Sequence, residues 1–370
     1  MIPLCIPFLN GNEWKYIKEC LDTNWVSSAG KYVDKFEEKF AEFLNCRKAV
    51  VTMNGTAALQ LALETLNVGE GDEVIVSSMT FISPVNAIKY VGAKPVFVDV
   101  DRETFVMDYH KIEELITEKT KAILPVHIYG YPVDMDKIQS LAKKYNLYVI
   151  EDATEALGTT YNGKMAGTIG DIGCFSFNGN KLITTGAGGM MVSNNFDYAK
   201  RAKYLSTQTK TILDNGAFVH EEVGYNFRMP NLLAAVGTAQ LEEIDDFLTI
   251  KRRNAHLYSK FLKDVDGITI VKNDDSKIDN SYWLYSILVE EDYPLSRDEL
   301  IEFLRKKGIE SRSFFMPVHD MKPYKECRKG DMTITDEISK RGINLPSSVS
   351  LKSDEIRYIC KCIKDAKKNR

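Results

Sequence analysis

The sequence predicts an α/β fold, in which helices cover both faces of a mostly parallel central sheet and a smaller α+β domain follows. Two observations support this prediction. From about residue 48 to 193, short apolar runs rich in β-branched residues alternate with amphipathic helical patterns, an order typical of parallel sheets with helical crossovers. After about residue 265 this alternation stops. We therefore expect a large domain over residues 1–250 and a small C-terminal domain over residues 251–370.

The strands of the predicted large sheet are short and apolar. They are RKAVVTM (47–53), DEVIVSS (72–78), KPVFVDV (94–100), KAILPVHI (121–128) and LYVIEDAT (147–154). The segments between them have helical periodicity, over residues 55–66, 82–92 and 134–145. Two further amphipathic helices, over residues 12–23 and 31–44, precede the first strand.

The C-terminal domain is predicted from its own patterns. Residues 230–262 indicate one long helix or two joined helices that lead into it. The later elements are strands over 267–271, 282–289 and 309–315, a helix over 296–308 and a final helix from Asp354. Either Ser296 or Asp298 can cap the helix over 296–308, and Gly308 fits its C-terminal end.

Composition narrows the classes of function. The chain has 370 residues, 44% of them hydrophobic, and a formal net charge of -4; it therefore has no basic field that would favour a nucleic-acid partner. Its seven cysteines are scattered without a CxxC pair, which argues against a disulfide framework or a metal site. We expect a cytoplasmic protein without a membrane partner, because neither a secretion signal nor an apolar run of about 18 residues is present.

Lys181 and Asp152 are the candidate catalytic residues. Lys181 lies in CFSFNGNKLITTGAGG (174–189), between an apolar strand and a run of small residues, where its amine can act as a nucleophile. Asp152 ends a predicted strand, at the edge where ligands of parallel sheets bind. Pyridoxal phosphate (PLP) needs such a pair: a lysine for its aldehyde and a carboxylate for its ring nitrogen. Taken alone, each has a simpler explanation, Lys181 as a turn residue and Asp152 as a helix cap.

Other strand ends carry residues that suit the rest of PLP. In MNGTAAL, Gly55 and Thr56 lie at a strand-to-helix junction, where free N–H groups and the helix dipole bind phosphate. Ser176 can add a further phosphate contact, and Phe81 in SSMTF can stack on the ring. The simpler explanations are a helix capped by Asn54 and a core phenylalanine.

The order of these segments resembles a known family. NGTAAL, the TF of SSMTF, EDATEALG, FSFNGNKLITTGAGG and GYNFRM resemble the DegT-type nucleotide-sugar aminotransferases, which are PLP enzymes of fold type I. The resemblance runs from about residue 3 to the C-terminus. It implies a fold type I aminotransferase that acts as a homodimer with shared active sites.

The resemblance also implies roles for individual residues. Lys181 holds PLP covalently and moves protons, Asp152 pairs with the pyridine nitrogen, and Glu155 lies near the phenolic oxygen. Related sugar dehydratases carry histidine at the lysine position, so Lys181 favours transamination. The remaining implied cofactor contacts are Gly55, Thr56, Phe81, Ser176 and, from the neighbouring subunit, Asn226.

The substrate is implied by the N-terminal segment and by the NGNK context. They resemble enzymes that use glutamate to aminate C4 of a UDP-linked 2-acetamido-4-keto-6-deoxyhexose, on the route to bacillosamine and legionaminic acid in bacterial glycans. The implied substrate contacts are Trp25, Ser27, Ser28, Lys31, Arg228 and His319. Their simpler explanations are a solvated Lys31, a surface ion pair of Arg228 and a satisfied buried His319.

Other functions remain open at this point. The enzyme can be specific for C3, or for a dTDP- or GDP-linked keto-sugar. A non-catalytic regulator that binds PLP or a nucleotide sugar is another class. A dinucleotide enzyme is suggested only by GAGG (186–189), which lacks the GxGxxG order and does not open a helix after a first strand.

Overall fold

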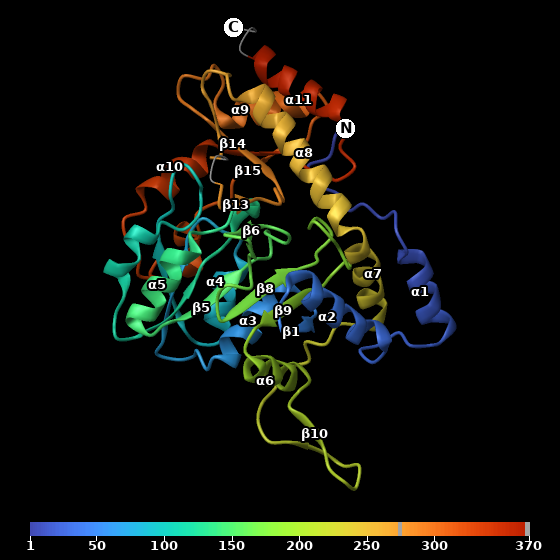
Figure 1. Ribbon diagram of the computed structural model, residues 1–370. Helices are drawn as coiled ribbons and strands as arrows, with labels where there is room; N and C mark the ends of the chain where they lie inside the picture. The colour runs from blue at the N-terminus through green and yellow to red at the C-terminus, as the bar shows by residue number, and fades with distance from the viewer. Residues whose placement is uncertain (273–275, 367–370) are drawn as a thin grey trace.

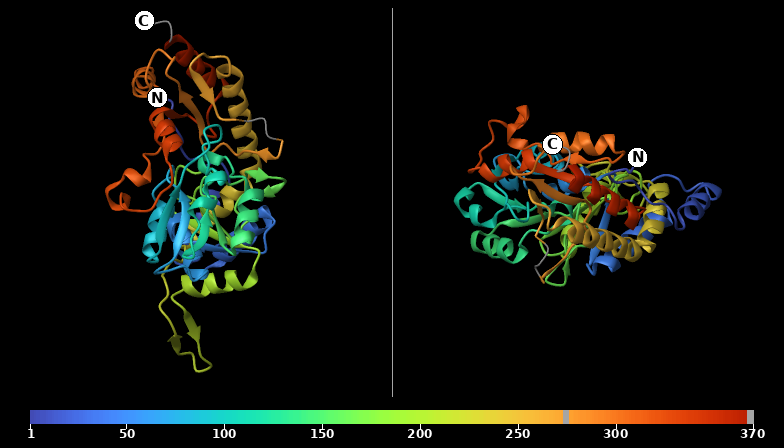
Figure 2. Two further views of the ribbon diagram at one scale, coloured as in Figure 1. Left: turned by 90° about the vertical axis from the view of Figure 1, so that its left-hand side faces the viewer. Right: turned by 90° about the horizontal axis from the view of Figure 1, so that it is seen from above.

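The computed structural model describes residues 1–272 and 276–366. Over these residues the chain forms a large unit built on a seven-stranded sheet and a smaller unit built on a four-stranded sheet. The start of the chain and the last described helix, α11 (Ser353–Ala366), lie at the smaller unit, and the hairpin of β10 (Lys210–Ile212) and β11 (Phe218–His220) projects from the opposite end (Figure 1; Figure 2).

The main sheet has the strand order β1-β9-β8-β5-β4-β2-β3. Its strands are β1 (Lys48–Thr52), β2 (Glu73–Ser77), β3 (Lys94–Val98), β4 (Thr120–Leu124), β5 (Tyr148–Asp152), β8 (Ile172–Ser176) and β9 (Gly189–Ser193). The five strands from β8 to β3 are parallel, so the predicted mostly parallel sheet is confirmed. Strand β9 is antiparallel to both neighbours, because it follows β8 through a loop without a crossover helix. GAGG leads into β9 and not into a helix, which removes the basis of the dinucleotide interpretation.

Helices cover both faces of this sheet. They are α2 (Lys31–Leu44), α3 (Gly55–Thr65), α4 (Ser83–Tyr90), α5 (Met135–Tyr145), α6 (Phe196–Ser206) and α7 (Asn231–Glu242), and α1 (Glu13–Asp22) packs on α7. Side chains of a strand alternate between the faces. Val50 accordingly joins the core cluster of Leu59 from α3, whereas Val51 joins that of Phe36 and Phe40 from α2. Because both faces are covered, the strands are apolar throughout and not alternating.

The smaller unit follows α8 (Ile244–Leu262), so the predicted segment 230–262 forms two joined helices. Ser296 is the N-cap of α9 (Arg297–Lys306), in a capping box with Glu299. Ile2, at the start of the chain, pairs with Ile309 of this unit. Its other elements are β12 (Ile268–Ile270), β14 (Tyr285–Val289), α9 (Arg297–Lys306), β15 (Arg312–Ser313), α10 (Thr333–Arg341), β16 (Gly342–Leu345) and α11 (Ser353–Ala366). A small sheet of β6 (Thr160–Tyr161), β7 (Lys164–Met165) and β13 (Ile278–Asp279) lies beside it.

The sequence did not predict α6, α10 or β16. The predicted domain boundary at residue 250 lies inside α8, and the division into two domains stays a prediction. Within residues 1–272 and 276–366, no helix combines the length and the hydropathy that crossing a membrane requires.

Candidate active site

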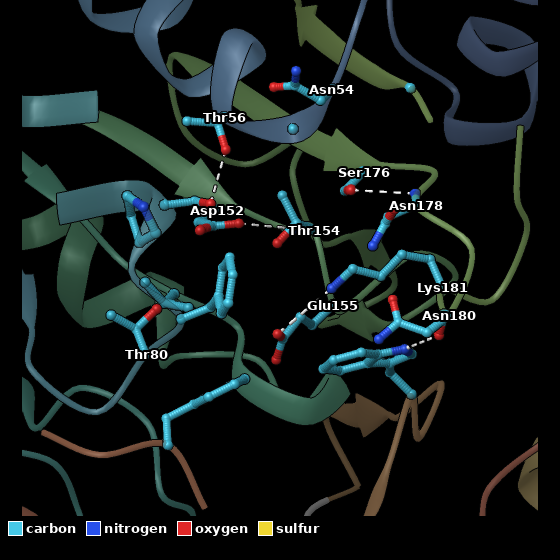
Figure 3. A pocket seen from close by; sticks show the side chains of 18 of the residues that line it. Asn54, Thr56, Thr80, Asp152, Thr154, Glu155, Ser176, Asn178, Asn180 and Lys181 are labelled. Atoms are coloured by element: carbon cyan, nitrogen blue, oxygen red, sulfur yellow. Dashed lines mark hydrogen bonds and ion pairs between the residues drawn. The ribbon is translucent and has the colours of Figure 1, made fainter. Parts of the chain in front are cut away.

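A pocket of about 240 Å³ lies beyond the carboxyl ends of the parallel strands (Figure 3). Segments that follow β1, β2, β5 and β8 line it, together with residues of the smaller unit. This is the edge at which parallel sheets bind ligands. Most of the predicted cofactor contacts line this one pocket, namely Gly55, Thr56, Phe81, Asp152, Glu155, Ser176 and Lys181.

Lys181 is carried by the loop between β8 and β9, and hydrogen bonds close this loop at its base. The N–H of Phe177 donates to the carbonyl of Gly188 at 2.8 Å, and the N–H of Thr185 donates to the carbonyl of Phe177 at 3.0 Å. The Lys181 side chain is 13% exposed, and its Nζ lies 3.5 Å from Oε1 of Glu155 (Figure 3). The loop therefore holds an amine inside the pocket and beside a carboxyl group.

The end of β5 carries two buried acids with different surroundings. Glu151 is fully buried, and its carboxylate lies 2.9 Å from Nε2 of His127. It also accepts hydrogen bonds from the N–H groups of Gly167 at 2.8 Å and Ile169 at 2.7 Å. Because its oxygens are satisfied by the surrounding chain, Glu151 is a structural residue.

Asp152 is also buried, but it has fewer partners. The N–H of Thr154 donates to its Oδ1 at 3.1 Å (Figure 3), and in the described part of the chain it forms no salt bridge. Burial raises the pKa of Asp152, while hydrogen bonds from Thr154 and the charge of Lys181 oppose this rise. A buried carboxylate without a cation is costly, so Asp152 suits a ligand that brings a positive charge into the pocket.

Glu155 lies in the turn that follows β5, three residues beyond Asp152. Its Oε2 accepts a hydrogen bond from the N–H of Tyr129 at 2.8 Å. Burial raises the pKa of Glu155, and the nearby charge of Lys181 lowers it. A carboxyl group in this position can share a proton with an oxygen atom of a bound ligand.

The start of α3 provides a site for an anion. The Asn54 side chain accepts from the N–H of Ala57 at 2.8 Å and caps the helix. The N–H groups of Gly55 and Thr56 have no hydrogen-bond partner among the residues that the structure describes. A Cβ on Gly55 would lie only 2.9 Å from Cβ of Ser176, so glycine is required for this close approach. Free amides at a helix N-terminus bind phosphate.

These groups fit PLP. The pocket offers free amides for a phosphate, a buried carboxylate without a cation for a pyridine nitrogen, and a lysine for an aldehyde. Phe81 is 55% exposed and lines the same pocket, with its ring centroid 5.8 Å from that of Phe315. An exposed aromatic face of this kind can stack on a planar ring.

Several residues that line the pocket were not identified from the sequence, among them Thr154, Trp283, Arg312 and Phe315. Thr154 lies within EDAT, two residues after Asp152. Its position in this motif could have identified it as a pocket residue. The other three come from the smaller unit and belong to no local motif. The Arg312 side chain is exposed, and its guanidinium forms no hydrogen bond or ion pair within the described ranges.

The predicted substrate contacts near the N-terminus lie elsewhere in this chain. Trp25 and Lys31 line a second pocket of about 490 Å³ beside α1 and α2. Lys31 forms an ion pair with Glu19, and the carbonyl of Ser27 accepts from the N–H of Asn231 at 2.6 Å. Ser28 lies in the same segment, between α1 and α2. Contact of these residues with a substrate stays a prediction.

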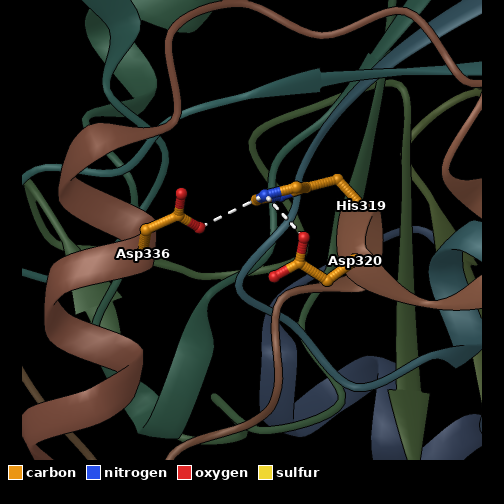
Figure 4. Close-up of side chains that lie close together, drawn as sticks. All are labelled: His319, Asp320 and Asp336. Atoms are coloured by element: carbon orange, nitrogen blue, oxygen red, sulfur yellow. Dashed lines mark ion pairs between the residues drawn. The ribbon is translucent and has the colours of Figure 1, made fainter.

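His319 is buried, and its ring points toward Asp320 and Asp336 (Figure 4). Its Nδ1 lies 2.8 Å from Oγ of Ser78, and its Nε2 lies 3.2 Å from Oδ1 of Asp336. It does not line the pocket of Lys181, so the simpler explanation, a satisfied buried histidine, fits this environment. Its contact with a substrate also stays a prediction.

Asn226 and Arg228 lie after the projecting hairpin and outside the pocket of their own chain. Arg228 donates to Oδ1 of Asn226 at 3.0 Å and to Oε1 of Gln208 at 3.1 Å. Asn226 is exposed. A phosphate contact of Asn226 would therefore have to be made in a different subunit.

Known proteins share both the sequence and the fold. Residues 7–364 match the DegT/DnrJ/EryC1/StrS aminotransferase family. The GDP-perosamine synthase of Escherichia coli O157:H7 is 46% identical, with 98% of each chain covered. The dTDP-4-amino-4,6-dideoxy-D-glucose transaminase of Shigella dysenteriae is 35% identical, with 95% of each chain covered. The protein Spr1654 of Streptococcus pneumoniae, solved in a PLP form, superimposes with a TM-score of 0.92 at 28% identity, covering 99% of this chain and 98% of its own. The chain therefore belongs to the DegT/DnrJ/EryC1/StrS aminotransferases and is a PLP-dependent sugar aminotransferase of fold type I.

Proposed function

We propose that the protein transfers an amino group from glutamate to the C4 keto group of a GDP-linked 4-keto-6-deoxyhexose, for the synthesis of a bacterial amino sugar. The observation that carries this proposal is the 46% identity to a GDP-perosamine synthase over 98% of both chains. The relative named for a dTDP-linked sugar is less similar, at 35% identity, but its name places the amine on C4. The expected UDP-linked 2-acetamido sugar has no support among these relatives, so one of the alternatives replaces it.

We assign each pocket residue a separate role toward the cofactor. Bound PLP supplies an electron sink for the α-carbon of the donor amine. In our proposal Asp152 stays anionic beside the ring nitrogen, and Lys181 moves a proton from the donor α-carbon to C4′. The amides of Gly55 and Thr56 and the Ser176 hydroxyl would hold the phosphate, and the face of Phe81 would hold the ring.

Arg312 is our candidate for binding the donor. Its guanidinium is exposed in the pocket and forms no ion pair in the described part of the chain. A planar guanidinium suits a carboxylate, to which it can donate two parallel hydrogen bonds. Glutamate carries two carboxylates, which supports its assignment as the amino donor.

The substrate proposal is tested with a panel of keto-sugars. Purified protein is incubated with PLP, glutamate and either a GDP-, dTDP- or UDP-linked 4-keto-6-deoxyhexose, and mass spectrometry measures the gain of an amine. We expect kcat/KM for the GDP-linked ketone to exceed the others by at least about 100-fold, because a site built for one base leaves polar groups unpaired with another.

Two controls make this experiment decisive. A reaction without glutamate must give no amine, and a GDP-linked 3-keto sugar must react more slowly than the 4-keto sugar. A faster reaction with the UDP-linked ketone would contradict the proposal and return the assignment to the UDP-linked class.

We also propose that the protein acts as a homodimer in which Asn226 serves the partner's site. The projecting hairpin and the segment after it expose several apolar side chains, namely Ile212, Leu213, Phe218 and Val223. A hairpin that extends from the body of a chain with an apolar surface suits burial against a second copy (Figure 1). Asn226 follows this hairpin and does not line the pocket of its own chain.

Mixed dimers test the shared site. Lys181→Ala and Asn226→Ala proteins are mixed and allowed to exchange subunits. In a mixed dimer one site receives both lesions and the other receives none, so we expect activity to return at about a quarter of all sites. Chemical cross-linking of the mixture before exchange is the control. No activity above that of both parents would contradict a shared site.

A further inference from the structure

We propose that Trp283 is a positioning residue that stabilises the ammonium which Lys181 forms between the two proton transfers of the proposed reaction. The Nζ atom of Lys181 lies over the indole of Trp283, 3.7 Å from the ring centroid. The indole is only 5% exposed and lines the same pocket. A cation over an indole face is attracted by the ring quadrupole, and the attraction is strongest where water is excluded.

The indole is fixed relative to the lysine by contacts at two points. Its N–H donates to the carbonyl of Asn180, the residue before Lys181, at 2.7 Å. The backbone carbonyl of Trp283 accepts from Nζ of the buried Lys251 at 2.8 Å. Because the ring is bound to the loop of Lys181 itself, it keeps its position when the lysine side chain is released.

The contact between Lys181 and Trp283 matters because the charge of Lys181 changes during the proposed proton transfer. In the proton transfer assigned to Lys181, the Cα–H bond of the donor breaks and an N–H bond forms at Nζ. That N–H bond then breaks as the proton passes to C4′, and the amine is neutral again. The electron pair of the Cα–H bond stays with the cofactor. Between the two steps Nζ is an ammonium, and the indole attracts this form but not the neutral amine.

Glu155 is the other neighbour of the ammonium, at 3.5 Å. Glu155 cannot replace the indole of Trp283 in stabilising the ammonium, because a carboxylate this close can also accept the proton of the ammonium. An indole face has no site for that proton. Trp283 therefore stabilises the charged lysine without competing for the proton that must reach C4′.

A fluorination series tests the contact with no change of shape. Tryptophan with one, two or four ring fluorines is placed at position 283 alone, since fluorine weakens the ring quadrupole. We expect the single-turnover rate with glutamate to fall stepwise, by about 10-fold over the series, with less than about a 2-fold change in the KM for glutamate. Equal rates across the series would overturn the proposal. Trp283→Phe should retain more of the rate than Trp283→Leu, because it keeps an aromatic face.

A second measurement uses protein without PLP and does not depend on the reaction. The ¹⁹F resonance of 5-fluorotryptophan at position 283 is compared between wild type and Lys181→Met, which removes the charge but keeps the length. We expect the resonance to move. Lys35→Met is the matched control, because Lys35 lies over the ring of Tyr16, and it should leave the resonance in place. An unchanged resonance in Lys181→Met would overturn the contact, whichever donor or sugar the enzyme uses. A shifted resonance in a protein that fails with every keto-sugar would instead count against the proposed substrate alone.

Discussion

Lys181→Ala is expected to abolish amine transfer, lowering kcat by at least about 10⁴-fold, because the variant loses both the covalent anchor and the proton carrier. The Lys181 amine is held inside the pocket by the loop between β8 and β9, and no second lysine lines this pocket among the described residues. The measurement is the formation of aminated sugar with glutamate as donor.

Borohydride reduction followed by peptide mass spectrometry gives an independent readout of the same variant. Wild type should yield a pyridoxyl adduct on the peptide that contains residue 181, and Lys181→Ala should yield none there. Lys35→Ala, at a partly exposed position of α2 outside the pocket of Lys181, should keep the adduct and the activity. An adduct on another lysine of the wild-type protein would contradict the assignment.

Asp152→Asn is expected to have opposite effects on activity and on stability. Activity should fall by about 10²- to 10³-fold, because an amide cannot hold the ring nitrogen in its charged form. The cofactor-free protein should become more stable, because wild type buries a carboxylate that forms no salt bridge with any described residue, whereas an amide carries no charge to desolvate. The amide oxygen can still accept the hydrogen bond from the N–H of Thr154.

The pH dependence of this stability difference follows from the direction of the pKa shift. Burial raises the pKa of Asp152, so the native state binds the proton more tightly than the unfolded chain. The unfolding free energy of cofactor-free wild type should therefore fall as pH rises from the ordinary carboxyl pKa through the raised one, and stay low above it. The amide of the Asp152→Asn variant does not titrate, so the stability advantage of this variant should grow over the same window.

Urea denaturation of both cofactor-free proteins from about pH 4 to about pH 8 measures this difference. Glu155→Gln provides a comparison, because burial raises the pKa of Glu155 as well. A difference between Asp152→Asn and wild type that shrinks as pH rises would contradict the argument. Addition of PLP should stabilise wild type more than the variant.

Much of the fold could be predicted because its patterns are local. The predicted helix over 134–145 is α5, and Asp134 caps it by accepting from the N–H of Lys137 at 3.2 Å. The reversed direction of β9 could not be predicted, because periodicity shows that a strand is buried but not which strand it pairs with. The pairing of Ile2 with Ile309 joins residues from opposite ends of the chain, and no local signal marks it.

The candidate site divides in the same way. Gly55, Asp152 and Lys181 each follow a strand of one sheet, so the rule that ligands bind at strand ends brought them together. Trp283 and Arg312 reach the pocket only through the packing of the smaller unit, and neither has a motif around it. The six predicted substrate contacts were inferred from the family resemblance, and none of them lines the pocket of Lys181.

The end of β5 also limits how this enzyme can change. Glu151 and Asp152 are adjacent in a strand, so their side chains point to opposite faces of the sheet. Glu151 forms structural hydrogen bonds, and Asp152 faces the pocket. A deletion or insertion of a single residue in this strand would exchange them. Glu151 would then face the pocket of Lys181, and Asp152 would be enclosed in the protein interior. The length of β5 is therefore constrained by the need to keep Glu151 and Asp152 on opposite faces of the sheet.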